Sequence, residues 1–261
     1  MPNPIDLLLD PVSLAILGIY AALILWESIA PARALPKAPA WRLRGITAFV
    51  VYFFLSSYLP LLWGEALASH TLFDLGTLPT WAGVLAGVAT YQFLAYWWHR
   101  GMHGSTLLWR VFHQMHHSAE RLDTWSAFWL SPLDMAGFTA VTSLALVGVV
   151  GLSPQATALT LLVLTLMSIF THTNVRTPRW LGYVVQRPES HSWHHARGRH
   201  RDNYSELPLF DLLFGTFSNP AEFAPATGFH DGASLRVAEM LVFRDVSEPG
   251  RPSPATEPLR G

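Results

Sequence analysis

The 261-residue chain contains no cysteine. This absence excludes disulfides, thiolate zinc sites, iron–sulfur clusters and haem attached through a Cys-x-x-Cys-His motif. Charged residues are also scarce, at 13% of the chain against about 25% in an ordinary soluble domain, whereas 51% of the residues are hydrophobic. The sequence therefore predicts a membrane protein in which imidazole or carboxylate groups hold any bound metal.

Basic arms and aromatic stacking platforms are lacking as well, and the formal net charge is −1, so we expect no nucleic-acid partner. The first six residues do not have the positive region of a secretory signal. We therefore expect the apolar stretch that follows them to be retained as a membrane span.

Apolar runs have lengths close to the roughly 17–25 residues that a helix needs to cross a bilayer. They lie at about 8–30, 46–63, 79–98, 133–151 and 155–173. Only Gly151-Leu-Ser-Pro154 separates the last two runs, which predicts a helical hairpin. The expected fold is an all-α integral membrane protein with about four to five transmembrane helices.

All seventeen lysines and arginines lie outside these runs: four between the first two, three between the third and fourth, and ten after the fifth. Five spans with the N-terminus outside place every one of them on the cytoplasmic side, in agreement with the positive-inside rule. Residues 99–132 and 174–245 then form a helical cap on that side. A re-entrant hairpin of residues 133–173 leaves the sidedness unchanged, so both topologies stay open.

Histidine is concentrated in three five-residue clusters, which hold eight of the twelve histidines. Spacings of three and four residues place side chains on one helix face, so each cluster can direct imidazoles at one point. A ninth histidine ends the fifth apolar run. The candidate metal-ligating and catalytic residues are His99, His103, His113, His116, His117, His172, His191, His194 and His195.

Nine ligands are too many for one metal, because a catalytic zinc typically takes about three from the protein. Two metal ions account for nine candidate ligands better than one does. Imidazole suits iron, zinc, copper and nickel alike. A paired centre beside apolar helices is well placed to act on lipid chains. Oxidation of inert C–H bonds requires a strong oxidant, and iron with dioxygen supplies one.

The histidine clusters and their flanks resemble the fatty acid hydroxylase / sterol desaturase superfamily over about residues 90–217. The motifs are Tyr96-Trp-Trp-His-Arg-Gly-Met-His103, Leu108-Trp-Arg-Val-Phe-His-Gln-Met-His-His-Ser118, His172-Thr-Asn174, Arg187-Pro-Glu-Ser-His-Ser-Trp-His-His195, Asn203-Tyr204 and Asp211-Leu-Leu-Phe-Gly-Thr216.

The resemblance implies a membrane-bound oxidoreductase that hydroxylates or desaturates a lipid, whether fatty acyl, sterol-like or related. It further implies two iron ions held by the nine histidines, with zinc as another occupant of the purified protein. Dioxygen is the expected co-substrate. Electrons are expected from a separate donor protein, because no haem or flavin module is visible in the chain.

The chain departs from the family pattern at three positions. Gln92 stands where many members have an aspartate seven residues before the first box histidine. Trp129 and Ser131 stand where many members carry an arginine and a histidine before a proline. We therefore do not expect the substrate preference of relatives to transfer to this chain.

Other polar residues are weaker candidates. Asp211 and Glu189 could accept a hydrogen bond from the distal nitrogen of a ligating imidazole, although a helix cap or an ion pair is the more ordinary role. His200 lies in an arginine-rich stretch and is kept off the ligand set. His70 is expected in an outside loop and His230 on the surface.

Residues 1–245 are expected to form one membrane-embedded domain, followed by a disordered, proline-rich tail at 246–261. Two other functions stay open. A zinc-dependent membrane hydrolase would need a glutamate beside paired ligands, as in His-Glu-x-x-His, and no cluster contains one. A non-catalytic metal- or haem-handling protein would place polar groups along a path through the membrane, whereas here they gather at one face.

Overall fold

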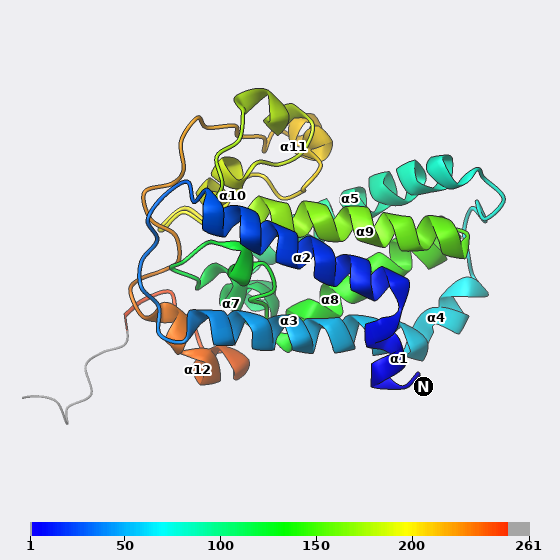
Figure 1. The fold of residues 1–261 in the computed structure, drawn as a ribbon, viewed down its shortest axis with the longest axis horizontal. Helices are drawn as coiled ribbons and strands as arrows, with labels where there is room; N and C mark the ends of the chain where they lie inside the picture. Colours follow the sequence, from blue (N-terminus) through cyan, green and yellow to red (C-terminus); the bar gives the residue numbers. More distant parts are fainter. Residues whose placement is uncertain (1, 250–261) are drawn as a thin grey trace, which may run out of the picture.

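A computed structural model describes residues 2–249, and every regular element within this range is a helix. A bundle of long apolar helices carries a cap of shorter helices at one end (Figure 1). The predicted all-helical fold is thus confirmed. Of the expected tail, Val246 is buried and its carbonyl accepts a hydrogen bond from His230 Nε2 at 3.2 Å, while residues 250–261 lie outside the described residues.

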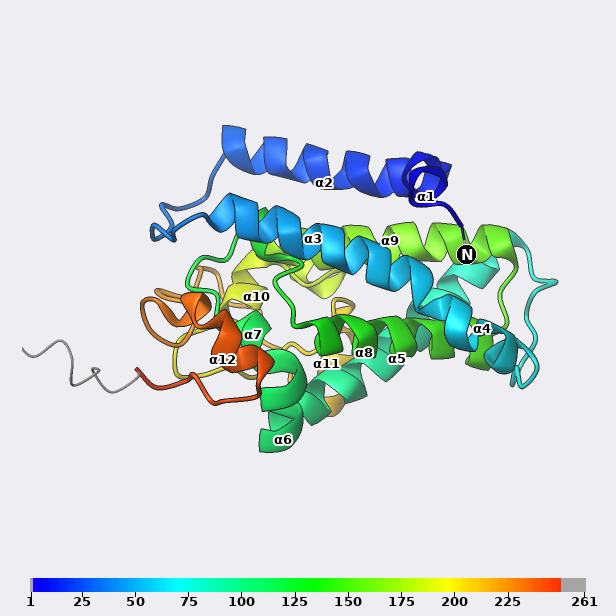
Figure 2. The same ribbon diagram turned by 90° about the horizontal axis from the view of Figure 1, so that it is seen from below.

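The long helices run along the length of the bundle (Figures 1 and 2). A π-helical segment, Leu144–Val149, extends α8, and α4 directly follows α3. The helices of the bundle are α2 (Pro11–Ile29), α3 (Trp41–Tyr58), α4 (Pro60–Ala68), α5 (Thr80–Gly104), α8 (Pro132–Ser143) and α9 (Pro154–His172).

Four helical stretches are long and apolar enough to cross a membrane, judged by length and composition: Pro11–Ile29, Trp41–Ala68, Pro132–Val149 and Pro154–His172. This number agrees with the expected four to five spans. The remaining apolar run, 79–98, lies in α5, which has 25 residues. Gln92 and the histidine-rich last turns of α5 make it more polar than the other four.

Capping residues fix where three of the long helices begin. Asp10, Ser131 and Ser153 each accept a hydrogen bond from a backbone N–H two or three residues further on, at the starts of α2, α8 and α9. A proline follows each of them at the first helical position, where its missing N–H is not needed. The boundaries therefore follow from local sequence.

Helix α5 lies at the centre of the packing: it contacts both α8 and α9, while α2 packs on α9 and α3 on α8 (Figure 2). The turn between α8 and α9 forms at the predicted position. Gly151 adopts φ +62° there, and a Cβ at this position would collide with Thr71. Helices α8 and α9, which this turn joins, both pack against α5.

Buried polar contacts tie the cap to the bundle. Glu27, buried in α2, accepts hydrogen bonds through Oε2 from the Thr124 backbone N–H (2.8 Å), the Thr124 hydroxyl (2.6 Å) and the Asn174 N–H (3.0 Å). Trp41 Nε1 donates to Asp123 Oδ1 at 2.9 Å. Phe128 of the cap packs against aromatic rings of α2 and α3. The loop before α8 and the segment after α9 are therefore held in place.

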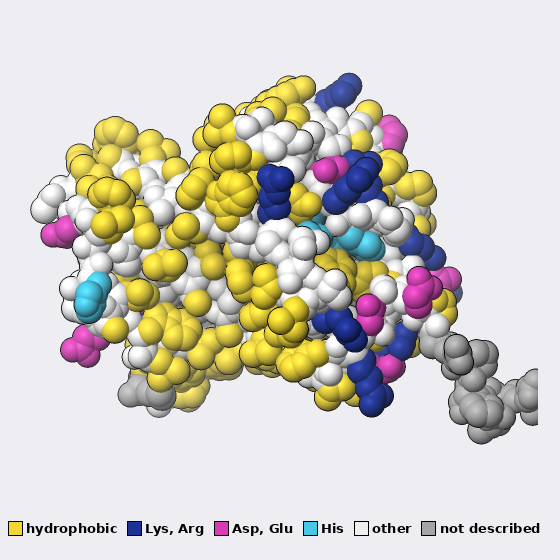
Figure 3. All heavy atoms as spheres, turned by 180° about the vertical axis from the view of Figure 1, so that it is seen from behind, with side chains coloured by type: hydrophobic (Ala, Val, Ile, Leu, Met, Phe, Trp, Pro, Cys, Tyr) yellow, Lys and Arg dark blue, Asp and Glu magenta, His cyan; other side chains and the backbone are white. Residues whose placement is uncertain are grey.

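Basic side chains gather over the half of the molecule that carries the cap, on the face drawn in Figure 3. On that face the other half shows acidic side chains and a histidine among hydrophobic ones. The N-terminus lies at the end of the bundle away from the cap (Figure 1). On this face, the basic residues that the sequence places outside the apolar runs therefore lie over one half of the molecule.

Candidate metal centre

All nine predicted histidines lie where the bundle meets the cap. They come from five segments: the last turns of α5, the π-helical turn Trp109–His113, α7 (Gln114–His117), the end of α9, and α10 (Pro188–His194) with the residue after it. Eight are buried and His103 is half-buried. Segments far apart in sequence thus bring imidazoles to one place.

The nine imidazoles form two groups, and within each group one nitrogen per ring lies within 4.8 Å of all the others. The first group contains His99, His103, His113, His117 and His194. The second contains His116, His172, His191 and His195. His172, an isolated histidine in the sequence, therefore sits among residues of the second and third clusters.

Two of the clusters divide their side chains between the groups. In α7 and the turn before it, His113 and His117 point to the first group and His116 to the second. In α10 the assignment is reversed: His191 and His195 point to the second group and His194 to the first. The pairs four apart point at one place, as expected, whereas the pairs three apart, His113–His116 and His191–His194, divide between the groups. The expectation that a spacing of three directs imidazoles at one point is therefore wrong here. A His-x-x-His-His sequence thus serves two sites at once.

The first group is oriented by backbone carbonyls from one short segment. His99 Nδ1 donates to the Tyr204 carbonyl at 2.8 Å, His103 Nδ1 to the His200 carbonyl at 2.8 Å, and His194 Nδ1 to the Asp202 carbonyl at 2.6 Å. His200, Asp202 and Asn203 all have positive φ values, which turn the chain sharply. These backbone conformations direct the carbonyls of His200, Asp202 and Tyr204 toward histidines of the first group.

Anchoring at Nδ1 also fixes the tautomer. A ring that donates through Nδ1 keeps a lone pair on Nε2 when neutral. In the first group the Nε2 atom of His99 lies 3.2 Å from that of His103 and 2.9 Å from that of His113. In the second, Nε2 of His116 lies 3.2 Å from Nε2 of His172. Facing lone pairs at these distances repel, and a cation between them removes the repulsion, so the residues present fit a metal.

Protonation supports the same conclusion. Burial, and next the nearby imidazoles, lower the pKa of His194 and of His195 well below the usual value. Both rings are therefore neutral at pH 7, which is the form that binds metals. The Nε2 atom of His117 and that of His194 are buried without a hydrogen-bond partner and are free to act as ligand atoms.

Asp134 is the one carboxylate that contacts a ring of these groups among the described residues. Its Oδ2 accepts a hydrogen bond from His113 Nδ1 at 2.8 Å, and both side chains are fully buried. Sequence reasoning missed this residue. The signal was available, because Asp134 is the only charged residue in 133–173. An ionisable residue in a membrane-spanning segment is costly, and for that reason it marks a functional site.

Asp211 contacts no histidine and works through the backbone instead. It accepts hydrogen bonds from the Tyr204 N–H (2.8 Å) and the Ser205 N–H (3.0 Å), and burial raises the pKa of its carboxyl to about 6. Gln92 holds the same segment: its Oε1 accepts from the Ser205 hydroxyl at 2.7 Å. Together they fix the carbonyl that orients His99.

Glu189 likewise does not touch an imidazole. It accepts hydrogen bonds from the Thr177 N–H and hydroxyl, both at 2.8 Å, and pairs with the buried Arg187 at 3.1 Å. This network fixes the start of α10 against the segment that follows α9.

The other two departures from the family pattern have structural roles. The Trp129 carbonyl faces His116 Nδ1 at 3.3 Å, and Ser131 caps α8.

His200 lies beside the first group, although the sequence does not predict it as a metal ligand. Its Nδ1 lies 3.0 Å from His117 Nδ1, and its Nε2 is buried without a partner. Burial lowers the pKa of His200 to about 4. The ring packs against Trp109 and Phe229. His200 thus touches a ring of the group without belonging to it. His70 and His230 lie apart from both groups.

Apolar helices of membrane-spanning length with nine imidazoles gathered at one end define a multi-pass membrane protein with a site suited to metal ions. The family model for fatty acid hydroxylases matches residues 84–216, about half of the chain. The chain therefore belongs to the fatty acid hydroxylase family, whose members are oxidoreductases of the hydroxylase and desaturase type. No solved structure matches it at a significant level.

Proposed function

We propose that the protein is a membrane-bound di-iron enzyme that hydroxylates or desaturates a lipid with dioxygen. The observation that carries the proposal is the pair of histidine groups, each with converging lone pairs, in a chain of the fatty acid hydroxylase family. Iron, when bound, supplies the capacity to activate dioxygen for attack on a C–H bond. The five histidines of the first group would hold one ion and the four of the second the other.

The chemistry balances with two electrons from outside. In hydroxylation, one C–H bond and the O–O bond break, the lipid gains a hydroxyl group, and one water forms at the expense of two electrons and two protons. In desaturation, two hydrogens leave the lipid and dioxygen ends as two waters with the same input. A separate donor protein must bring the electrons, and arginines on the cap, which lie among acidic side chains in Figure 3, offer contacts to acidic groups of such a partner.

The chain's own residues prepare the site. Backbone carbonyls of the segment from His200 to Tyr204 hold imidazoles of the first group, and Asp134 keeps the proton of His113 on Nδ1. The cap and the ends of the helices bury the histidines and keep water from them. These contacts orient the ligands before metal binds.

The zinc hydrolase is less well supported. Neither histidine group contains a carboxylate among the described residues, and Asp134 is already engaged with His113. Among the described residues, no free carboxylate in either group is therefore placed to act as the general base that activates water for hydrolysis.

Metal and oxygen measurements on the purified protein test the proposal. We expect one iron for each histidine group, and oxygen uptake coupled to lipid oxidation after anaerobic reduction. His194→Ala should lower the iron content and abolish oxidation, while His70→Ala, at an exposed site away from both groups, should change neither. Stoichiometric zinc with hydrolysis and no oxygen uptake would overturn the proposal.

We further propose that α5 is a fifth span and that the cap faces the cytoplasm. Helix α5 has 25 residues and packs along α9, itself long and apolar enough to cross a membrane. Five spans put the N-terminus outside and all basic residues inside. A reporter fused after Asp74 should be extracytoplasmic, and a cytoplasmic signal there would exclude this topology.

A further inference from the structure

Exposed apolar side chains gather on one part of the cap. They belong to α11 (Pro208–Phe214) and to the short helix Arg179–Tyr183 with the residue after it, and these two elements contact each other. Each side chain is 46–65% exposed, and contiguous apolar surface of this kind marks a site of interaction. We refer to it as the α11 patch, which consists of Trp180, Tyr183, Val184, Leu209, Leu212 and Leu213.

Helix α11 turns its apolar face outward. Leu209, Leu212 and Leu213 follow each other at spacings of three and four residues, so they share one face of the helix. Asp211 lies on the opposite face, where it is buried and accepts a hydrogen bond from the Tyr204 N–H at 2.8 Å. A helix on a water-exposed surface has the reverse arrangement, with its apolar side toward the core. The orientation of α11 therefore indicates apolar surroundings outside this part of the cap.

The α11 patch is continuous with the apolar flank of the bundle. Phe93 and Trp97 of α5 are 41% and 45% exposed. Their ring centroids lie 5.6 Å from that of Phe210 and 4.9 Å from that of Phe214, respectively. Helix α5 packs along α9, which is long and apolar enough to cross a membrane. Along the long axis of the molecule, α11 lies level with the cap-side part of α9 rather than beyond its end (Figure 1). The patch therefore lies at the depth of the lipid leaflet on the cap side.

Aromatic and basic side chains in and beside the patch are of the types found at a membrane interface. Trp180 and Tyr183 combine an apolar ring with a polar group, and such residues are enriched where acyl chains meet headgroups. Near the α5 end of the patch, the Arg100 guanidinium lies 5.6 Å from the centroid of the Trp97 ring. Arg179, at the start of the other element, is exposed. Arginine at this level can reach headgroups while its stem stays against apolar surface.

The position of the α11 patch favours lipid over a protein as the partner that covers it. A water-soluble protein that approaches the cap from its free end would have to displace lipid beside α5 and α9 before it could contact α11. Lipid, in contrast, surrounds the bundle at this depth. The bilayer therefore covers the patch without a separate association step.

We propose that the α11 patch is inserted into the leaflet on the cap side, at the boundary between headgroups and acyl chains. Apolar helix faces at this boundary lie about 5–10 Å deep. The inference goes beyond the proposed function and holds with or without metal and turnover. It also connects the membrane to the first histidine group. Through Asp211, α11 holds the backbone at Tyr204, whose carbonyl orients His99.

Single introduced cysteines test the insertion, because the chain contains no cysteine of its own. Leu213→Cys is labelled with a thiol-reactive bimane fluorophore and reconstituted into vesicles of palmitoyl-oleoyl-phosphatidylcholine. Two quenchers are compared: iodide in the water, and phosphatidylcholine with a nitroxide near the headgroup end of an acyl chain. The nitroxide lipid should quench this label. Iodide should quench it at least about fivefold less than a label in water, because transfer of an anion into apolar surroundings is strongly unfavourable.

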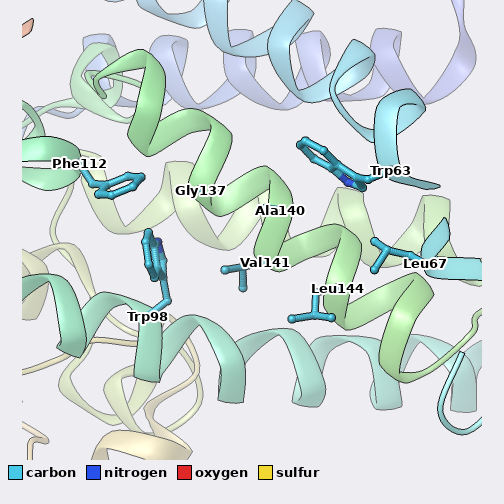
Figure 4. A pocket seen from close by; sticks show the side chains of 8 residues that line it. All are labelled: Trp63, Leu67, Trp98, Phe112, Gly137, Ala140, Val141 and Leu144. Carbon is cyan, nitrogen blue, oxygen red and sulfur yellow. The ribbon is translucent and has the colours of Figure 1, made fainter. Parts of the chain in front are cut away.

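Two other exposed leucines supply matched controls. Leu235, which is 52% exposed, lies on the cap in a small recess that Lys37 and Asp231 also line. A label at Leu235→Cys should be quenched by iodide and not by the nitroxide lipid. Leu144, which is 44% exposed, lies in the apolar stretch Pro132–Val149 and lines a pocket on the bundle (Figure 4). A label at Leu144→Cys should be accessible to the nitroxide lipid and not to iodide.

Quenching of Leu213→Cys that matches Leu235→Cys would overturn the insertion. Leu209→Cys, on the same face of α11, carries the same expectation, so the test does not depend on the folding of one variant. A second copy of the chain on the patch would protect the label from both quenchers. It would also give energy transfer between chains labelled with donor and acceptor, and this result would overturn lipid as the partner. The same quenching is expected with metal-free protein, so a failure of the proposed function leaves this test unaffected.

Discussion

Replacement of Asp134 by asparagine isolates the effect of one buried charge on metal binding. The carboxylate accepts the proton on His113 Nδ1 at 2.8 Å, the length of a charge-assisted hydrogen bond. The asparagine side chain has nearly the same shape and can still accept this hydrogen bond through its amide oxygen. What disappears is the negative charge that makes the imidazole a stronger ligand.

The expected magnitude follows from hydrogen-bond energies. A hydrogen bond to a charged group contributes about 1.5–3 kcal/mol and a neutral one about 0.5–1.5 kcal/mol. The difference is about 1.4 kcal/mol, or a tenfold loss of affinity. Asp134→Ala additionally leaves a buried N–H without a partner, which brings the loss to roughly 100-fold. Both values lie within the range of about 10–100-fold for residues that orient metal ligands.

Chelator competition measures this effect. The loaded protein is titrated with a chelator of known affinity, and metal per chain is determined by elemental analysis. The metal of the first histidine group should be released earlier in Asp134→Asn, while that of the second stays close to wild type. Ser153→Ala removes a helix cap on α9 and serves as the control for a purely structural loss of about 1 kcal/mol. Release curves that coincide for Asp134→Asn, Asp134→Ala and the control would refute the reasoning.

Three further outcomes are expected. His200→Phe keeps the packing but removes the ring nitrogen beside His117, so metal affinity of the first group should fall by about tenfold; unchanged chelator competition would exclude a positioning role. Asp211→Ala frees the Tyr204 N–H and loosens the carbonyl that orients His99, so metal content should fall with the helical circular dichroism retained; full occupancy would contradict this. The metal-free protein should lose thermal stability as the pH drops from 7 to 5. Buried histidines have lowered pKa values, whereas unfolded ones take up protons near pH 6.5, so folding weakens as the pH falls. A melting temperature that rises or stays constant over this range would argue against neutral buried imidazoles.

The sequence predicted the helices and the gathering of histidines because both depend on local periodicity. Apolar runs of bilayer length indicate long helices, and a spacing of four residues indicates two imidazoles that point at one place. The turn at Gly151 followed from the short Gly-Leu-Ser-Pro link. These features can be predicted without knowing which helices pack against each other.

The division of histidines between two groups could not be predicted in this way. It depends on how α7 and α10 face each other, which is decided by tertiary packing. The carbonyls of His200, Asp202 and Tyr204 have no sequence signature, because every residue carries one. Asp134 differs from these cases, since a lone carboxylate in an apolar run is visible in the sequence.

The reversed assignment of α7 and α10 has a mechanical consequence. Each of these helices supplies side chains to both histidine groups. With metal bound, neither helix can move away from the site without breaking bonds to two ions. The two helices are then fixed to each other, and this part of the cap cannot open as a unit. Binding of the metals and fixing of α7 and α10 in their positions therefore occur together.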